Sequence, residues 1–79
     1  MISPEGYYEM FLKGKTADEI KKEIRRLRRQ IRKLQKEVDD PNHEGWAICP
    51  SPYVQLEMHR LYLQKAVETL MDTEEYLTV

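Results

Sequence analysis

The feature of this chain that most constrains its fold is an unbroken heptad of apolar residues between two helix boundary signals. The apolar stripe consists of Ile20, Ile24, Leu27, Ile31, Leu34 and Val38, at alternating spacings of four and three residues. Such spacing predicts an α-helix with one narrow apolar seam, which suits a single helical neighbour better than a broad globular core. Thr16 and Glu19 form a capping box, and Pro41 forbids continuation, so the helix is predicted over residues 16–40.

Two further segments carry helix signals. Ser3 before Pro4 predicts the start of a short helix, and Ser51 before Pro52 predicts the start of a longer one. The predicted order is helix 3–13, helix 16–40, loop 41–50, helix 52–71 and acidic tail 72–79. We therefore expect one all-α domain of residues 1–79, in which a short N-terminal helix packs on an antiparallel pair of longer helices.

The third predicted helix is apolar on two sides. One face carries Leu56, Leu63, Ala66, Val67 and Leu70, and a second patch carries Val54, Met58 and Leu61. The first face is expected to meet the second helix, and the second patch to meet the first helix or another subunit. Because a chain of 79 residues buries only a small core, we expect a homodimer or larger bundle. Parallel pairing of the heptad with its own copy is an alternative.

The charge of the chain is distributed very unevenly. Residues 21–36 carry nine cations and one acid, Glu23, which gives +8, so a net charge of −1 leaves −9 for the other residues. We call these nine cations the basic face: Lys21, Lys22, Arg25, Arg26, Arg28, Arg29, Arg32, Lys33 and Lys36. Like charges three or four residues apart destabilise a helix. The pattern indicates either a surface that binds phosphate or acidic groups, or one neutralised by the acidic remainder of the same chain or of an oligomer.

Aromatic residues suggest how a phosphorylated ligand could be held. Tyr7 and Trp46 could stack on bases while arginines and lysines contact phosphates, although rings at helix junctions more often serve packing. The predicted anion-binding residues are Arg25, Arg26, Arg29 and Lys33, with Tyr7 and Trp46 as the stacking rings.

Other chemistry is poorly supported by the sequence. His43, Cys49 and His59 lack the close pairing of metal ligands, and His59 is expected to be a packed, hydrogen-bonded side chain. Glycine-rich phosphate loops are missing, so no catalytic residue, metal or cofactor is expected, and the protein is predicted not to be an enzyme. With one cysteine, no long apolar run and no signal-peptide pattern at the N-terminus, the expected location is cytoplasmic, without membrane contact.

The layout resembles a known family, the small phage anti-defence proteins that sequester cyclic-nucleotide signals (the anti-CBASS sponge family). The matching features are Gly6-Tyr7 with Glu9, Thr16 with Glu19-Ile20, Asp40-Pro41, and Trp46-Ala47-Ile48. The resemblance covers most of the chain, but the basic run 21–36 departs from the family pattern. It implies a three-helix chain in a compact oligomer, with Tyr7 stacking on a base and Lys22 or Arg26 contacting a phosphate.

Two classes of function follow from these observations. The first is a non-enzymatic, phage-encoded anti-defence protein that sequesters a phosphorylated, cyclic nucleotide through its basic helix. The alternative is a nucleic-acid-binding or protein-inhibitor module whose basic helix docks on an anionic partner.

Overall fold

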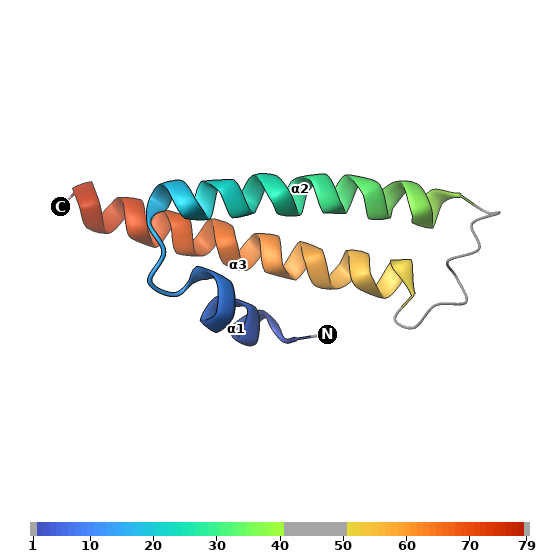
Figure 1. The fold of residues 1–79 in the computed structure, drawn as a ribbon, viewed down its shortest axis with the longest axis horizontal. Coiled ribbons are helices and arrows are strands. Elements are labelled where there is room, and N and C mark those ends of the chain that lie inside the picture. The colour runs from blue at the N-terminus through green and yellow to red at the C-terminus, as the bar shows by residue number, and fades with distance from the viewer. Residues whose placement is uncertain (1, 41–50, 79) are drawn as a thin grey trace.

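The computed structural model describes residues 2–40 and 51–78, with side chains described as far as Thr73. Helix α1 (Pro4–Tyr7) continues as a π-helix, η1 (Tyr8–Leu12), and is followed by α2 (Ala17–Asp39) and α3 (Pro52–Thr78). The helices α2 and α3 lie antiparallel, and the N-terminal helices pack on α3 (Figure 1). The described residues contain no strand. The prediction of an all-α fold with a short N-terminal helix on a hairpin of two longer helices is confirmed.

The start of α2 is set by the predicted capping box. The Thr16 hydroxyl accepts a hydrogen bond from the Glu19 backbone N–H at 3.2 Å, and a Glu19 carboxylate oxygen accepts one from the Thr16 backbone N–H at 3.4 Å. Just before it, Gly14 has a φ of 76°, in the left-handed region that glycine adopts without steric cost. The local sequence therefore both turns the chain and begins the long helix.

The N-terminal segment changes its helical type at Tyr8. Ser3 caps α1 by accepting a hydrogen bond from the Gly6 backbone N–H at 3.1 Å, and the segment then continues as the π-helix η1. The wider π-helical turn brings Tyr7 and Leu12, which are five residues apart, into the core together. Met10 and Phe11 consequently stay 66% and 44% exposed.

The core lies along the seam where the helices meet. Its main cluster consists of Tyr7, Leu12, Ile20, Ile24, Leu27, Tyr62 and Ala66. The apolar stripe of α2 faces α3, with Ile20, Ile24, Leu27 and Leu34 buried and Ile31 and Val38 half-buried. Helix α3 of the same chain covers this stripe. The stripe is therefore not free for the alternative that its heptad spacing also allowed, which is parallel pairing with a second copy of the chain.

Helix α3 differs from its expected form in length and in one core residue. It continues past the expected end at Met71 to Thr78, since no glycine or proline follows Met71 to interrupt it. Its far end extends beyond the start of α2 (Figure 1). Tyr62 is buried, and its hydroxyl donates a hydrogen bond to the backbone carbonyl of Ile2 at 2.5 Å. This bond ties the start of the chain to α3.

The second apolar patch of α3 is only partly covered by the described residues. Met58 packs against the core, while Val54 and Leu61 remain exposed. Leu61 lines a small hollow together with Pro4, where α1 meets α3. The second patch is therefore packed against the core at Met58 and remains exposed at Val54 and Leu61.

Candidate anion-binding surface

Within residues 21–36, the nine cations of the basic face are separated around α2 from the other residues of the segment. At about 100° per residue, they fall within an arc of about 160°, and the seven other residues of the segment 21–36 fall outside it. Glu23, the only acid in this segment, lies beyond the edge of the arc that Arg26 occupies. The segment spans about 22 Å along the helix axis. The result is a continuous cationic ridge without an acid between its members.

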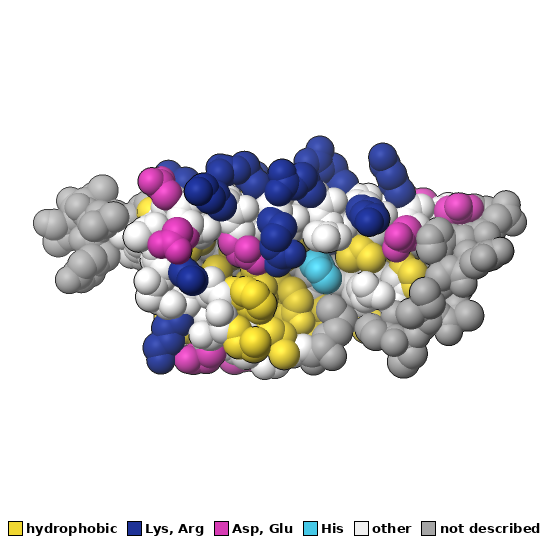
Figure 2. All heavy atoms as spheres, viewed as in Figure 1, with side chains coloured by type: hydrophobic (Ala, Val, Ile, Leu, Met, Phe, Trp, Pro, Cys, Tyr) yellow, Lys and Arg dark blue, Asp and Glu magenta, His cyan; other side chains and the backbone are white. Residues whose placement is uncertain are grey.

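The basic face is exposed because it lies opposite the seam with α3. Eight of its members are exposed, namely Lys21, Lys22, Arg25, Arg28, Arg29, Arg32, Lys33 and Lys36, while Arg26 is half-buried. Figure 2 shows lysine and arginine side chains following the edge of the molecule formed by α2. The buried stripe and the basic face thus share one helix, and binding at the ridge requires no rearrangement of the core.

Arg26 differs from the rest of the basic face because it is held by an acid of its own helix. Its Nη2 lies 2.5 Å from Glu23 Oε1, its Nε donates to both carboxylate oxygens, and the Tyr7 hydroxyl donates to the same Oε1. The hydrogen bond from Arg26 lowers the pKa of Glu23, and the same bond raises the pKa of Arg26. Within the described part of the chain, Arg26 therefore has its charge already paired.

The other cations of the basic face have a different environment. Among the described residues, no ion pair is formed by Lys22, Arg25, Arg28, Arg29, Arg32, Lys33 or Lys36. Ion pairs among the described residues that do not involve the basic face include Lys13–Glu9, Lys15–Glu19 and Arg60–Glu57. These seven cations are therefore not held in ion pairs by the described acids of their own chain.

The structure brings together four of the predicted ligand-binding residues. Lys22, Arg25, Arg29 and Lys33 share the exposed ridge. The other four exposed members of the ridge are not among the predicted contacts: Lys21, Arg28, Arg32 and Lys36. Their spacing of three or four residues from the predicted cations is the signal that would have included them.

Tyr7 does not belong to this surface. Its side chain is only 2% exposed, and its ring stacks on Tyr62 at 4.6 Å and on Phe11 at 5.1 Å between centroids. Burial raises the pKa of its hydroxyl, and the hydrogen bond to Glu23 raises it further. The expectation that Tyr7 stacks on a base is therefore corrected, because packing already covers the ring. Trp46, the other expected stacking residue, lies outside the described residues.

A shallow hollow runs along the C-terminal half of the basic face. It has a volume of about 520 Å³ and is lined by Arg29, Arg32, Lys33, Gln35 and Lys36, all from α2. A hollow formed by one helix has no opposing wall that could enclose a small ligand. This geometry suits an extended anion that lies along the ridge.

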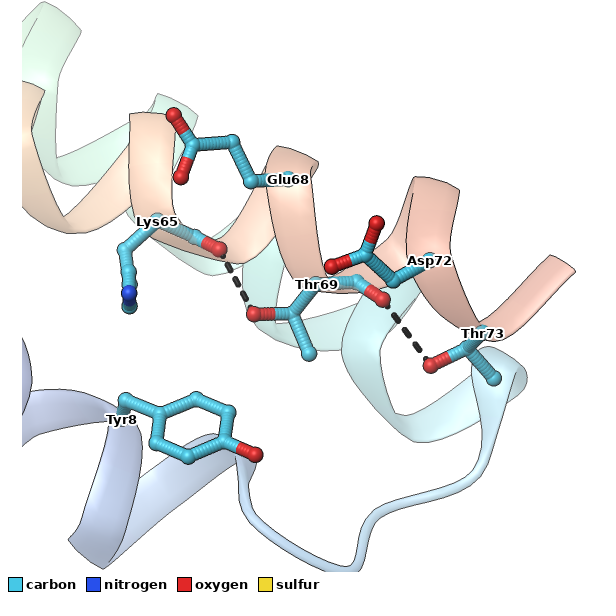
Figure 3. Close-up of a pocket in the computed structure, with 6 residues that line it drawn as sticks. All are labelled: Tyr8, Lys65, Glu68, Thr69, Asp72 and Thr73. Atoms are coloured by element: carbon cyan, nitrogen blue, oxygen red, sulfur yellow. Dashed lines mark hydrogen bonds between the residues drawn. The ribbon is translucent and has the colours of Figure 1, made fainter. Parts of the chain in front are cut away.

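A second hollow lies between η1 and the C-terminal half of α3 (Figure 3). Its volume is about 450 Å³, and its lining residues are Tyr8, Lys65, Glu68, Thr69, Asp72 and Thr73. The Lys65 amine lies 5.5 Å from the centre of the Tyr8 ring, and the two threonine hydroxyls donate to backbone carbonyls of α3. With two carboxylates and one amine, this hollow does not extend the anion-binding surface.

Metal binding and membrane insertion find no support in the described residues. No group of three or more histidine, cysteine or acidic side chains there could hold a metal ion, and no helix there could cross a membrane. As expected, His59 is hydrogen-bonded and packed, with Nδ1 lying 2.7 Å from the Gln55 carbonyl and the ring close to Tyr62. Comparisons with protein-family models, with curated proteins and with solved structures found no match to this chain.

Proposed function

We propose that this protein is a non-enzymatic binding protein that holds the phosphate backbone of a nucleic acid on its basic face. The observation that carries the proposal is the ridge of eight exposed cations along α2, without an intervening acid. Arginine and lysine contacts to phosphates supply most of the affinity of non-specific nucleic-acid binding. Retaining so many adjacent like charges weakens the helix, and a polyanionic partner would offset that cost.

The shape of the ridge favours a polymer over a small cyclic nucleotide. The cations extend over about 22 Å of helix, which is long enough to contact several consecutive phosphates. A sponge for a small nucleotide would need an enclosing pocket and a stacking ring, whereas Tyr7 is buried and the hollow on the basic face is open on one side. We therefore place the nucleic-acid alternative ahead of nucleotide sequestration.

Salt dependence is the direct test of this proposal. Binding of a fluorescent duplex is measured by anisotropy between 50 and 300 mM salt, in steps. If five cations contact phosphates, log K is expected to fall by about 4.5 for each tenfold rise in salt. Failure to bind any DNA or RNA at the lowest salt would reject the proposal and leave an acidic protein as the partner to consider.

A charge-reversal pair locates the binding surface. The variant Arg25→Glu/Arg29→Glu is expected to abolish binding, while Arg26 is left intact because it is paired with Glu23. The matched control is Lys13→Glu/Lys65→Glu, which changes the net charge equally at Lys13, exposed and paired with Glu9, and at Lys65 of α3, which lies against the Tyr8 ring. Equal loss of binding in both variants would mean that net charge, and not the basic face, governs the affinity.

A further inference from the structure

We propose that the nucleic acid is B-form duplex DNA and that α2 lies in its major groove. This inference rests on the proposed function and adds the class of ligand and the way it is bound. It starts from the width of the basic face around the helix. The arc of about 160° covers nearly half the circumference of α2 and is wider than contact with a flat surface requires.

The two edges of this arc point in nearly opposite directions. Arg28 lies at one edge and Lys33 at the other, beside Arg26, whose charge is already paired with Glu23. On a flat anionic surface these edge cations would point sideways, past the ligand. In a groove, the two phosphate backbones flank the helix on both sides, so both edges gain contacts.

The dimensions of the outer half of α2 fit this placement. An α-helix with side chains is about 10–12 Å across, and the major groove of B-DNA is about 12 Å wide and 8.5 Å deep. The covering helix α3 lies on the opposite side of α2, and the N-terminal helices pack on α3 (Figure 1). The described helices therefore leave the outer face of α2 free to enter the groove, except at the Arg26 edge, where the Tyr7 hydroxyl reaches Glu23.

Other nucleic acids fit the basic face less well. The major groove of A-form RNA is deep and narrow, so that side chains do not read it. Proteins that bind single strands combine cations with aromatic rings on which bases stack, and residues 21–36 contain no aromatic residue. Duplex DNA is the ligand for which cations alone, on both sides of a helix, are sufficient.

The centre of the arc would then face the base edges. Arg25 and Arg29 lie near this centre and are exposed. Guanine presents O6 and N7 as acceptors in the major groove, and arginine is suited to bind both at once. If α2 lies in the major groove, guanine N7 should therefore be covered when the protein is bound.

The test compares three ligands of equal length and sequence: duplex DNA, duplex RNA and single-stranded DNA, at one salt concentration. Duplex DNA is expected to bind at least about tenfold more tightly than either of the others, which corresponds to about 1.4 kcal/mol. Equal binding of all three would overturn the groove placement and leave the proposed function intact. No binding to any of them would overturn both.

Protection from dimethyl sulfate, which methylates guanine N7, reports occupancy of the groove directly. The bound protein is expected to protect guanines in a G·C-containing duplex, and Arg25→Gln/Arg29→Gln should reduce protection at a protein concentration that still saturates the DNA. Arg28→Gln/Lys33→Gln, which removes one cation at each edge, should lower the salt slope by about two and retain protection. Saturated binding without protection, or an unchanged slope for the edge variant, would overturn the inference.

Discussion

The hydroxyl of Tyr7 donates a hydrogen bond to the carboxylate of Glu23, which also holds Arg26. The N-terminal helix is thereby connected to α2 at one edge of the basic face. The contact is half-buried, and Tyr7 in turn stacks on Tyr62 of α3. One side chain thus joins all three parts of the fold and helps to fix the orientation of an arginine at the surface.

Removal of the Tyr7 hydroxyl should destabilise the fold measurably. Tyr7→Phe keeps the stacked ring and deletes one hydrogen bond to a charged group, so the free energy of unfolding should fall by about 1–3 kcal/mol. Tyr8→Phe is the matched control, because no hydrogen bond of its hydroxyl is found among the described residues, and it should change stability by less than about 0.5 kcal/mol. Urea denaturation followed by circular dichroism measures both, and equal effects would contradict a specific role for the Tyr7–Glu23 bond.

Stability should decrease on the acid side because of Glu23. The hydrogen bond from Arg26 lowers the pKa of this carboxyl in the folded state below its unfolded value. The folded state therefore binds a proton less readily, so the stabilisation is complete above the unfolded pKa and is lost as the pH falls through the folded one. Glu23→Gln should flatten this acid limb relative to the parent. Denaturation midpoints measured from pH 7 down to pH 3 test the expectation, and parallel curves for the two proteins would contradict it.

The buried stripe should dominate the stability of the hairpin. Leu27 is fully buried, so Leu27→Ala is expected to cost about 2–5 kcal/mol, which would unfold a marginal domain. Ile20→Val, with an expected cost of about 0.5–1.5 kcal/mol, keeps the comparison measurable if Leu27→Ala does not fold. Leu61→Ala is the exposed control and should cost much less. If Leu61→Ala lowered the free energy of unfolding more than Ile20→Val, the packing that stabilises the fold would lie outside the described core.

The parts of the fold that the sequence predicts are those with local causes. Thr16 and Pro52 begin helices through capping and proline geometry, and the alternating apolar spacing of α2 defines its buried stripe without knowledge of the partner. The π-helical turn at Tyr8 has no comparable local signal. It depends on the packing of Tyr7 and Leu12 against the long helices, which is a tertiary effect.

The same distinction holds for the candidate surface. The exposure of Arg25, Arg29 and their neighbours follows from their spacing relative to the apolar stripe, so the sequence predicts it. The burial of Tyr7 could not be read from spacing, because a tyrosine near a helix end suits either a core or a stacking platform. The burial of Tyr7 depends on two residues that are distant in sequence. Glu23 accepts the hydrogen bond of the Tyr7 hydroxyl, and Tyr62 stacks on the Tyr7 ring.

The capping box should contribute to stability independently of packing. Thr16→Ala removes the side chain that accepts from the Glu19 backbone N–H and is expected to cost about 0.5–2 kcal/mol. Thr16→Ser retains the hydroxyl and should restore most of the loss. Thermal unfolding of the parent, Thr16→Ala and Thr16→Ser measures these differences in stability. An equal loss of stability in the serine and alanine variants would show that the hydroxyl is not what stabilises the start of α2.

Stability and binding should respond in opposite directions when the charge of the basic face is reversed at one position. Arg29 lies three or four residues from four other cations of α2: Arg25, Arg26, Arg32 and Lys33. Arg29→Glu converts these repulsive spacings into attractive ones, which should raise the free energy of unfolding by about 1–2 kcal/mol at low salt. The gain should shrink in 500 mM salt, because screening weakens interactions between exposed charges. The same variant should bind nucleic acid more weakly than the parent. A variant that is neither more stable nor weaker in binding would show that the ridge carries no repulsion and contacts no phosphate.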